Sequence, residues 1–225
     1  MRNALRVVWW RIRSVLWRLL WRVQLRLFPA RSFHDIKVSL YAVLDERTEA
    51  ECFAKVEAAL DLIARYDRRR LRTIGRSLDR IWIRRTTYAA AYYIDATRLC
   101  VIDRAWLTGD TTPDRVAAAI IHEATHARLY RHKIPYAEAL RPRIEAICDE
   151  ESAAFVARLP EGAALAERIR KGGPDPDHWS DVNLARRSRT ARQDAIRSAR
   201  EEMEASDLPN WVKKVLRRLG RFRAA

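Results

Sequence analysis

Two histidines and one glutamate stand close together in residues 116–130, which read VAAAIIHEATHARLY. His122 and His126 are four residues apart, so on a helix their rings lie on one face, about 40° apart around the axis, where they can share one metal ion. Glu123 is the only full charge among residues 116–127, and burying an isolated carboxylate is costly. The spacing predicts a zinc-binding helix in which Glu123 leans over the ion and polarises a bound water.

A catalytic zinc ion normally has three protein ligands and one position for water. Glu145 is separated from His126 by 18 residues and stands near the start of the next expected helix, so it is available as the third ligand. Asp149 follows it by four residues, on the same helical face. The sequence offers further candidates for the third position, namely Cys148, Glu138, Glu150 and Glu151.

The resulting pattern, HExxH–x18–ExxxD, resembles gluzincin metallopeptidases. The resemblance covers about residues 120–151 and the order of strands before the helix, so the chain is similar to a minimal, single-domain (minigluzincin-like) member. In those enzymes the downstream Glu ligates zinc and the acid four residues later hydrogen-bonds a ligand histidine. The resemblance therefore implies these roles for Glu145 and Asp149, in agreement with the general rule for ligand histidines. Arg128 departs from the family, which often has an apolar residue at that position.

The resemblance also implies an activity, the hydrolysis of bonds in a peptide or protein substrate. Glu123 would accept the proton of the zinc-activated water and return it to the leaving amine. The tetrahedral oxyanion needs a further hydrogen-bond donor. Tyr136, ten residues past His126, is the first candidate by analogy with gluzincins that use a connector tyrosine; His132 and His178 are alternatives.

The elements that must position these residues predict an α+β fold. We expect a mainly helical, zincin-like domain with a small, mostly antiparallel sheet before the HExxH helix, and an N-terminal amphipathic helix. Period-two alternation indicates strands at residues 36–44 and 79–85, and a hairpin at 90–94 and 99–102 whose edge can pair with an extended substrate. Thr112 and Pro113 mark the start of the HExxH helix, with a hydroxyl cap. Further helices are expected at residues 46–70, 143–159, 163–171, 181–206 and 208–222.

The formal net charge of +15 is concentrated at the ends of the chain. Residues 1–34 hold eight arginines and no acid, and most of the remaining excess lies in the C-terminal quarter, so the middle is near neutral. We expect three parts: a basic, Trp/Arg-rich helix at residues 1–30, the metallopeptidase domain at 31–171, and a polar, basic helical extension at 172–225. The three isolated cysteines argue against a disulfide framework and fit a reducing compartment.

The N-terminal segment has tryptophan and leucine on one side of a helical wheel and arginines on the other, which is the composition of a helix lying in a membrane interface. We expect residues 1–28 to bind an anionic membrane surface, and the protein to be cytoplasmic and membrane-associated. Secretion is disfavoured because the segment lacks a clean apolar core and a small-residue cleavage site. A helix docked on the protein's own core, a transit peptide and a single-pass anchor are the alternatives.

Two other functions stay open on the sequence alone. One is a membrane-peripheral scaffold whose zinc site is structural or vestigial, with Cys148 or a fourth acid closing the last coordination position. The other is a nucleic-acid-associated protease, for which the net charge is the argument. The basic ends lack a recognisable nucleic-acid module and are Trp/Leu-amphipathic, so nucleic acid is the less favoured partner.

Overall fold

The computed structural model describes residues 30–40, 46–86, 89–172, 180–205, 210–211 and 213–214. Within these residues the fold is α+β, with a five-stranded mixed sheet and seven α-helices, so the expected class is confirmed. Three expectations lie outside the described residues: the N-terminal helix at 1–30, His178, and nearly all of the helix expected at 208–222. No helix in the described part of the chain is long and apolar enough to cross a membrane.

The sheet consists of β1 (Ala30–Phe33), β2 (Ile36–Leu40), β3 (Arg80–Arg84), β4 (Ala91–Ile94) and β5 (Leu99–Asp103) in the order β1-β2-β3-β5-β4. Its three central strands, β2, β3 and β5, run parallel, and β1 and β4 are antiparallel edge strands. The expectation of a mostly antiparallel sheet is therefore wrong. A helical connection joins β2 to β3 and returns the chain in the same direction, which makes the pair parallel. The hairpin of β4 and β5 is confirmed.

The helical connection between β2 and β3 has a break that the sequence pattern did not predict. The helix expected at residues 46–70 is two helices, α2 (Glu46–Tyr66) and α3 (Arg68–Ser77). Asp67 separates them, and its carboxylate accepts a hydrogen bond from the backbone N–H of Arg70, which caps the N-terminus of α3. The buried face expected for the first helix is confirmed: it includes Cys52, Val56, Ala59, Leu60 and Ile63.

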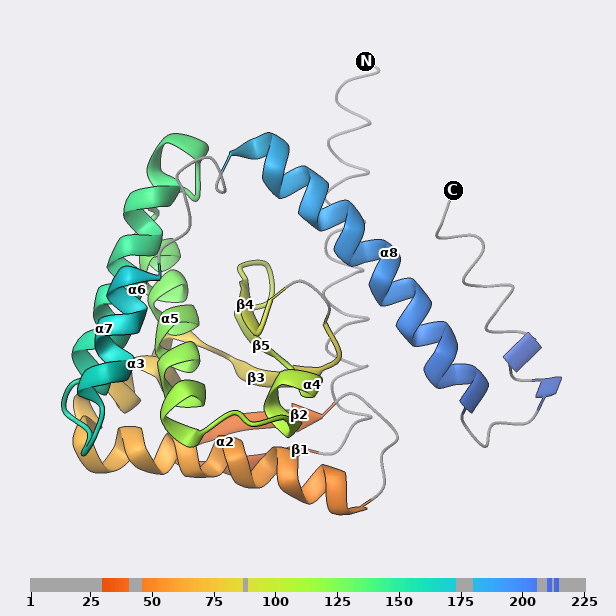
Figure 1. Cartoon of the computed structure of the whole chain (residues 1–225), viewed down its shortest axis with the longest axis horizontal. Coiled ribbons are helices and arrows are strands. Elements are labelled where there is room, and N and C mark those ends of the chain that lie inside the picture. Colours follow the sequence, from red (N-terminus) through yellow and green to blue (C-terminus); the bar gives the residue numbers. More distant parts are fainter. Residues whose placement is uncertain are drawn as a thin grey trace.

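The HExxH motif lies on α5 (Pro113–Arg131), which follows the short α4 (Arg104–Thr108). Thr112 is the N-cap residue, but its side chain makes no capping hydrogen bond, so the expected hydroxyl cap is absent. A connector with a 3-10 turn, η1 (Glu138–Leu140), leads to α6 (Arg141–Val156). α7 (Ala163–Lys171) and α8 (Asp181–Ala205) follow; Figure 1 shows α5, α6 and α7 standing side by side, with α8 on the opposite side of the view.

The main core lies between one face of the sheet and the helices α2, α5 and α6. Alternate strand residues such as Ile81 and Ile83 face this core. Trp82, between them, belongs to a second small cluster with Leu99 and Val101 on the opposite face. β3 was expected to be half-buried, and this is wrong, because its three central residues are all buried. The core holds α5 firmly against the sheet, so its histidines project from a rigid element.

Candidate metal centre

The imidazole rings of the two histidines of α5 and one carboxylate of α6 lie close together. The Nε2 atoms of His122 and His126 are 3.1 Å apart. Glu145 places one oxygen 3.2 Å from Nε2 of His122 and the other 3.5 Å from Nε2 of His126. A tetrahedral zinc ion with bonds of about 2.0–2.2 Å separates its ligand atoms by about 3.3–3.5 Å. The three side chains are therefore close enough together to hold one zinc ion.

Close packing of α6 on α5 brings the three donors together. The hydroxyl of Ser152 lies 3.0 Å from the carbonyl oxygen of Ala118 on α5 and 2.9 Å from that of Cys148 on its own helix. These small, buried side chains let the two helix backbones approach each other. Glu145 is one turn inside α6, and its carboxylate consequently faces the histidines across the helix interface.

Asp149 lies behind the site, against the other nitrogen of one histidine. Its carboxylate oxygen is 3.2 Å from Nδ1 of His122, so the ring can donate there while its Nε2 faces Glu145. Burial lowers the pKa of His122, but hydrogen bonds with Asp149 and Glu145 outweigh it and raise the pKa to about 10. Burial raises the pKa of Glu145, and the two histidines outweigh it and hold the pKa well below its usual range. The donors thus form a tight set of opposite charges.

Glu123 is buried beside the donors, with 6% of its surface exposed. Burial raises the pKa of its carboxyl, and His122 and His126 oppose that rise. The backbone N–H of Tyr93 in β4 also donates to this carboxylate. A buried carboxyl with an elevated pKa and an oriented hydrogen bond is well suited to accept and return a proton.

Tyr136 reaches the same site from the connector between α5 and α6. Its hydroxyl donates a hydrogen bond to Glu145, and its ring packs edge-on against His126 at 5.6 Å between centroids. The guanidinium of Arg141 lies 5.3 Å from the tyrosine ring and donates to the Tyr136 carbonyl at 3.2 Å. Burial and the Glu145 carboxylate raise the pKa of the phenol well above its usual value, so the hydroxyl keeps its proton. Sequence spacing gave no hint of the supporting role of Arg141.

Cys148 is the one rival ligand that lies at the site. His122, His126 and Cys148 each offer one atom within 4.8 Å of the others. Burial and the neighbouring carboxylate of Glu145 raise the pKa of this thiol well above its usual value in the metal-free protein. Glu145 contacts both histidines and is the first candidate for the third donor, and Cys148, which is fully buried beside it, is the alternative.

The remaining candidate side chains lie away from the histidine pair. Glu150 pairs with Arg170 at 2.9 Å on the exposed surface. Glu138, on η1, accepts a hydrogen bond from the backbone N–H of Asp181. His132 ends α5 and is exposed. None of these side chains contacts the histidine pair among the contacts of the described residues.

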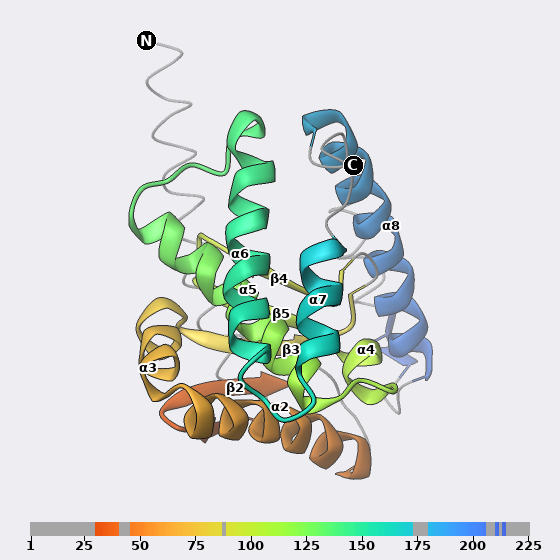
Figure 2. The same cartoon turned by 60° about the vertical axis from the view of Figure 1, so that its left-hand side comes forward.

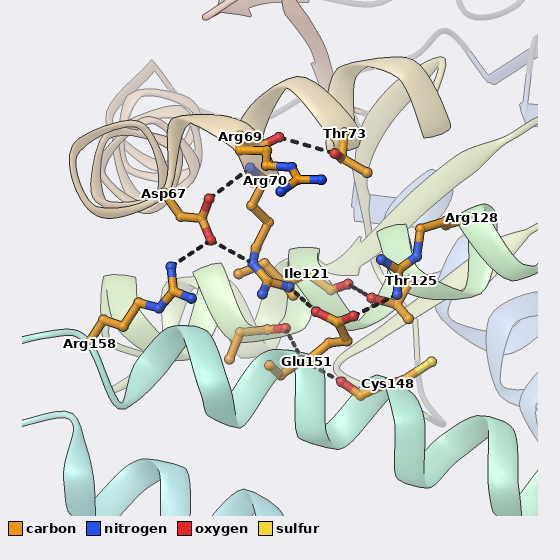
Figure 3. A network of polar contacts seen from close by, with 12 residues as sticks. Asp67, Arg69, Arg70, Thr73, Ile121, Thr125, Arg128, Cys148, Glu151 and Arg158 are labelled. Atoms are coloured by element: carbon orange, nitrogen blue, oxygen red, sulfur yellow. Dashed lines mark hydrogen bonds and ion pairs between the residues drawn. The ribbon is translucent and has the colours of Figure 1, made fainter.

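Glu151 belongs to a chain of charged contacts that joins four parts of the fold (Figure 3). Its carboxylate accepts hydrogen bonds from Arg128 of α5 at 2.7 Å and from Arg70 of α3 at 2.6 Å. Arg70 also bonds Asp67 at 3.2 Å, and Asp67 accepts from Arg158 at 3.0 Å. Arg128, where an apolar residue was expected by family resemblance, thus ties the HExxH helix to α6. We call this chain of five residues the Glu151 network.

The chain was compared with family models, with curated proteins and with solved structures, and none of them matches it.

Proposed function

We propose that the protein is a zinc-dependent metallopeptidase of gluzincin type that hydrolyses peptide bonds. The observation that carries the proposal is the close approach of His122, His126 and Glu145, which we call the donor triangle. The two histidine Nε2 atoms lie 3.1 Å apart, and the two carboxylate oxygens of Glu145 lie 3.2 Å and 3.5 Å from one Nε2 each. Two histidines and one carboxylate are a donor set used by catalytic zinc sites, which leave the fourth position open. Asp149 at Nδ1 of His122 is the partner that such a histidine normally has.

The buried carboxylate next to this triangle is the proposed proton carrier. Zinc bound here would supply Lewis-acid chemistry, lowering the pKa of a water and polarising a carbonyl group. Glu123 takes the proton of the attacking water and gives it to the leaving amine, and the Tyr93 N–H holds its carboxylate in place. Tyr136, protonated and beside Glu145, turns to donate a hydrogen bond to the oxyanion.

A peptide or protein substrate also needs a surface that holds it extended. β4 is an edge strand that contacts α5, and it carries the Tyr93 N–H that reaches Glu123. An extended peptide can add to this edge as a further strand, with its backbone passing the donor triangle. This arrangement supports a peptide as the substrate class.

Metal analysis and two variants test the proposal. The wild-type protein should bind about one zinc ion per chain by metal analysis after purification. His122→Ala should lose the metal, and Glu123→Gln should keep it and lose hydrolysis of an unstructured protein such as casein. A wild-type chain with intact donors and no stoichiometric zinc, even after zinc is supplied, overturns the proposal.

A second candidate function is a scaffold with a structural zinc site, and the position of Cys148 favours it. Its sulfur lies within 4.8 Å of histidine donor atoms and could close the fourth position. X-ray absorption of the zinc protein separates the two, because a bond of about 2.3 Å to sulfur marks the structural site. Binding of residues 1–28 to an anionic membrane stays a prediction for either function, and association with nucleic acid remains the less favoured alternative.

A further inference from the structure

The outer face of α3 carries a stripe of arginines. We define the arginine stripe as the four exposed residues Arg68, Arg69, Arg72 and Arg76. At 100° per residue they fall within a sector of about 100°, and they span about 12 Å along the helix axis. α3 contains no acidic residue, and residues 65–76 hold six arginines and one acid. The middle of the chain is thus near neutral in total, but its basic and acidic residues are concentrated in different places.

The single acid of this segment is turned away from the stripe. Asp67 lies in the Glu151 network, where Arg70 and Arg158 hold its carboxylate. Figure 3 shows Arg70 reaching from α3 towards Glu151 on the inner side of the helix. Among the contacts of the described residues, no carboxylate pairs with a guanidinium of the stripe. Within the part of the chain that the structure describes, the charge of the stripe is therefore not paired with an acid.

The end of α5 extends this basic surface. A guanidinium nitrogen of Arg131 donates to the carbonyl oxygen of Arg76 at 3.3 Å, so the two arginines lie side by side. Lys133 follows two residues later and is exposed. Arg98 also donates to the Arg76 carbonyl, but Asp79 pairs with it at 3.2 Å. Figure 2 shows α3 at the left margin of the domain, and the four arginines of the stripe are exposed.

We propose that the arginine stripe docks the protein on the anionic lipid phosphates of a membrane surface. Guanidinium groups bind phosphate oxygens in pairs of hydrogen bonds, and clustered arginines are attracted to anionic bilayers. The proposal does not depend on the zinc site. It adds a second contact, on the folded domain, to the membrane contact expected for residues 1–28, and electrostatic attraction to anionic lipids strengthens the binding of an interfacial helix.

Nucleic acid fits this surface less well. Proteins that bind single strands stack bases on aromatic rings, but the ring next to the stripe, Tyr66, has the guanidinium of Arg65 over it at 5.6 Å. A helix that reads duplex DNA must enter the major groove, whereas α3 packs against both α2 and α5 and exposes only its outer face. A broad anionic surface fits the arginine stripe better than a nucleic acid does.

Vesicle co-sedimentation of the full chain tests the proposal. The test variant is Arg68→Gln/Arg72→Gln/Arg76→Gln. The control variant is Arg168→Gln/Arg186→Gln/Arg189→Gln, which removes the same charge from exposed positions on α7 and α8. Glutamine is a good helix former, and circular dichroism checks that both variants fold. The vesicles are phosphatidylcholine with or without phosphatidylserine, each at low and high salt.

The test variant should bind the phosphatidylserine vesicles about a hundredfold more weakly than wild type, from about fivefold for each arginine. The control variant should lose only a few-fold, and high salt should reduce the difference between the two. Equal losses in both variants, or no loss in the test variant, overturn the proposal. So does a test variant that loses affinity for duplex DNA, or for an acidic peptide, while it keeps its affinity for the vesicles.

Discussion

The carboxylate of Asp149 lies 3.2 Å from Nδ1 of His122, one helical turn beyond Glu145 on α6. It fixes the ring so that Nε2 points at the donor triangle, and it makes the imidazole a better ligand. Asp149→Ala should therefore lower zinc affinity about 10- to 100-fold with little change in fold. Competition with a chelator measures the affinity. Unchanged affinity would show that the contact does not orient the ligand.

Neighbouring glutamates on α6 offer a matched test of the Glu151 network. Glu151 bonds Arg128 and Arg70, whereas Glu150 pairs with Arg170 at the surface. Glu151→Gln should weaken zinc binding about tenfold, because α6 loses its tie to α5, while Glu150→Gln should leave it within about twofold. Chelator competition on both variants, with thermal unfolding of the metal-free forms, gives the measurement. If the two variants bind zinc with equal affinity, the Glu151 network contributes only to stability.

The same network makes stability sensitive to acid. Despite their burial, arginine contacts keep the pKa values of Asp67 and Glu151 below their ordinary values of 3.8 and 4.5. A carboxyl whose pKa is lowered in the folded state stabilises the fold above its unfolded pKa, and this contribution is lost as the pH falls through the folded value. The stability difference between wild type and Glu151→Gln, about 2 kcal/mol at neutral pH, should shrink below about pH 4.5. Urea unfolding across pH measures it; a constant difference would contradict this account.

Tyr136→Phe separates the hydroxyl from the ring of the connector tyrosine. The phenyl ring can keep its packing on His126, so zinc should stay bound. Loss of an oxyanion donor should reduce kcat by about a hundredfold, with a smaller effect on KM. Steady-state hydrolysis with metal content measured on the same sample checks this. A variant with full activity would exclude the hydroxyl as the donor.

Gly162, between α6 and α7, should be essential for stability for a steric reason. A Cβ atom there would lie 1.9 Å from the carbonyl oxygen of Val156, and backbone cannot yield that far. Gly162→Ala should lower the melting temperature by several degrees. Gly75→Ala is the control, since its Cβ would lie 3.9 Å from Ile36 and alanine favours the helix. Equal melting temperatures for the two variants would rule out the predicted clash.

Periodicity and spacing located the parts of the site that depend on local geometry. Positions four apart on a helix share a face, so the pairing of His122 with His126, and of Glu145 with Asp149, could be predicted. The two pairs can come together because the helices that carry them are joined by a connector. The network around Glu151 could not be predicted, because Arg70 lies 81 residues before Glu151 and no spacing rule spans that distance.

The expected fold differs from the structure where a local sequence pattern is compatible with more than one structure. An apolar stripe continues across Asp67, so one long helix was expected, but a side chain that caps a new helix there breaks it. The strand pattern of residues 79–85 fits a half-buried strand, yet Trp82 is covered on the second face of the sheet. The strand–helix–strand order before Arg84 favours a parallel pair, because a helical crossover returns the chain in the same direction.

The α5–α6 pair also has a consequence for the order of folding. His122 and Glu145 are only 23 positions apart, whereas Val38 of β2 meets Ile81 of β3 across 43 positions (81 − 38). Contacts of short sequence separation require less loop closure and form sooner. His122 and Glu145 should therefore meet in a helical hairpin before the parallel sheet is complete.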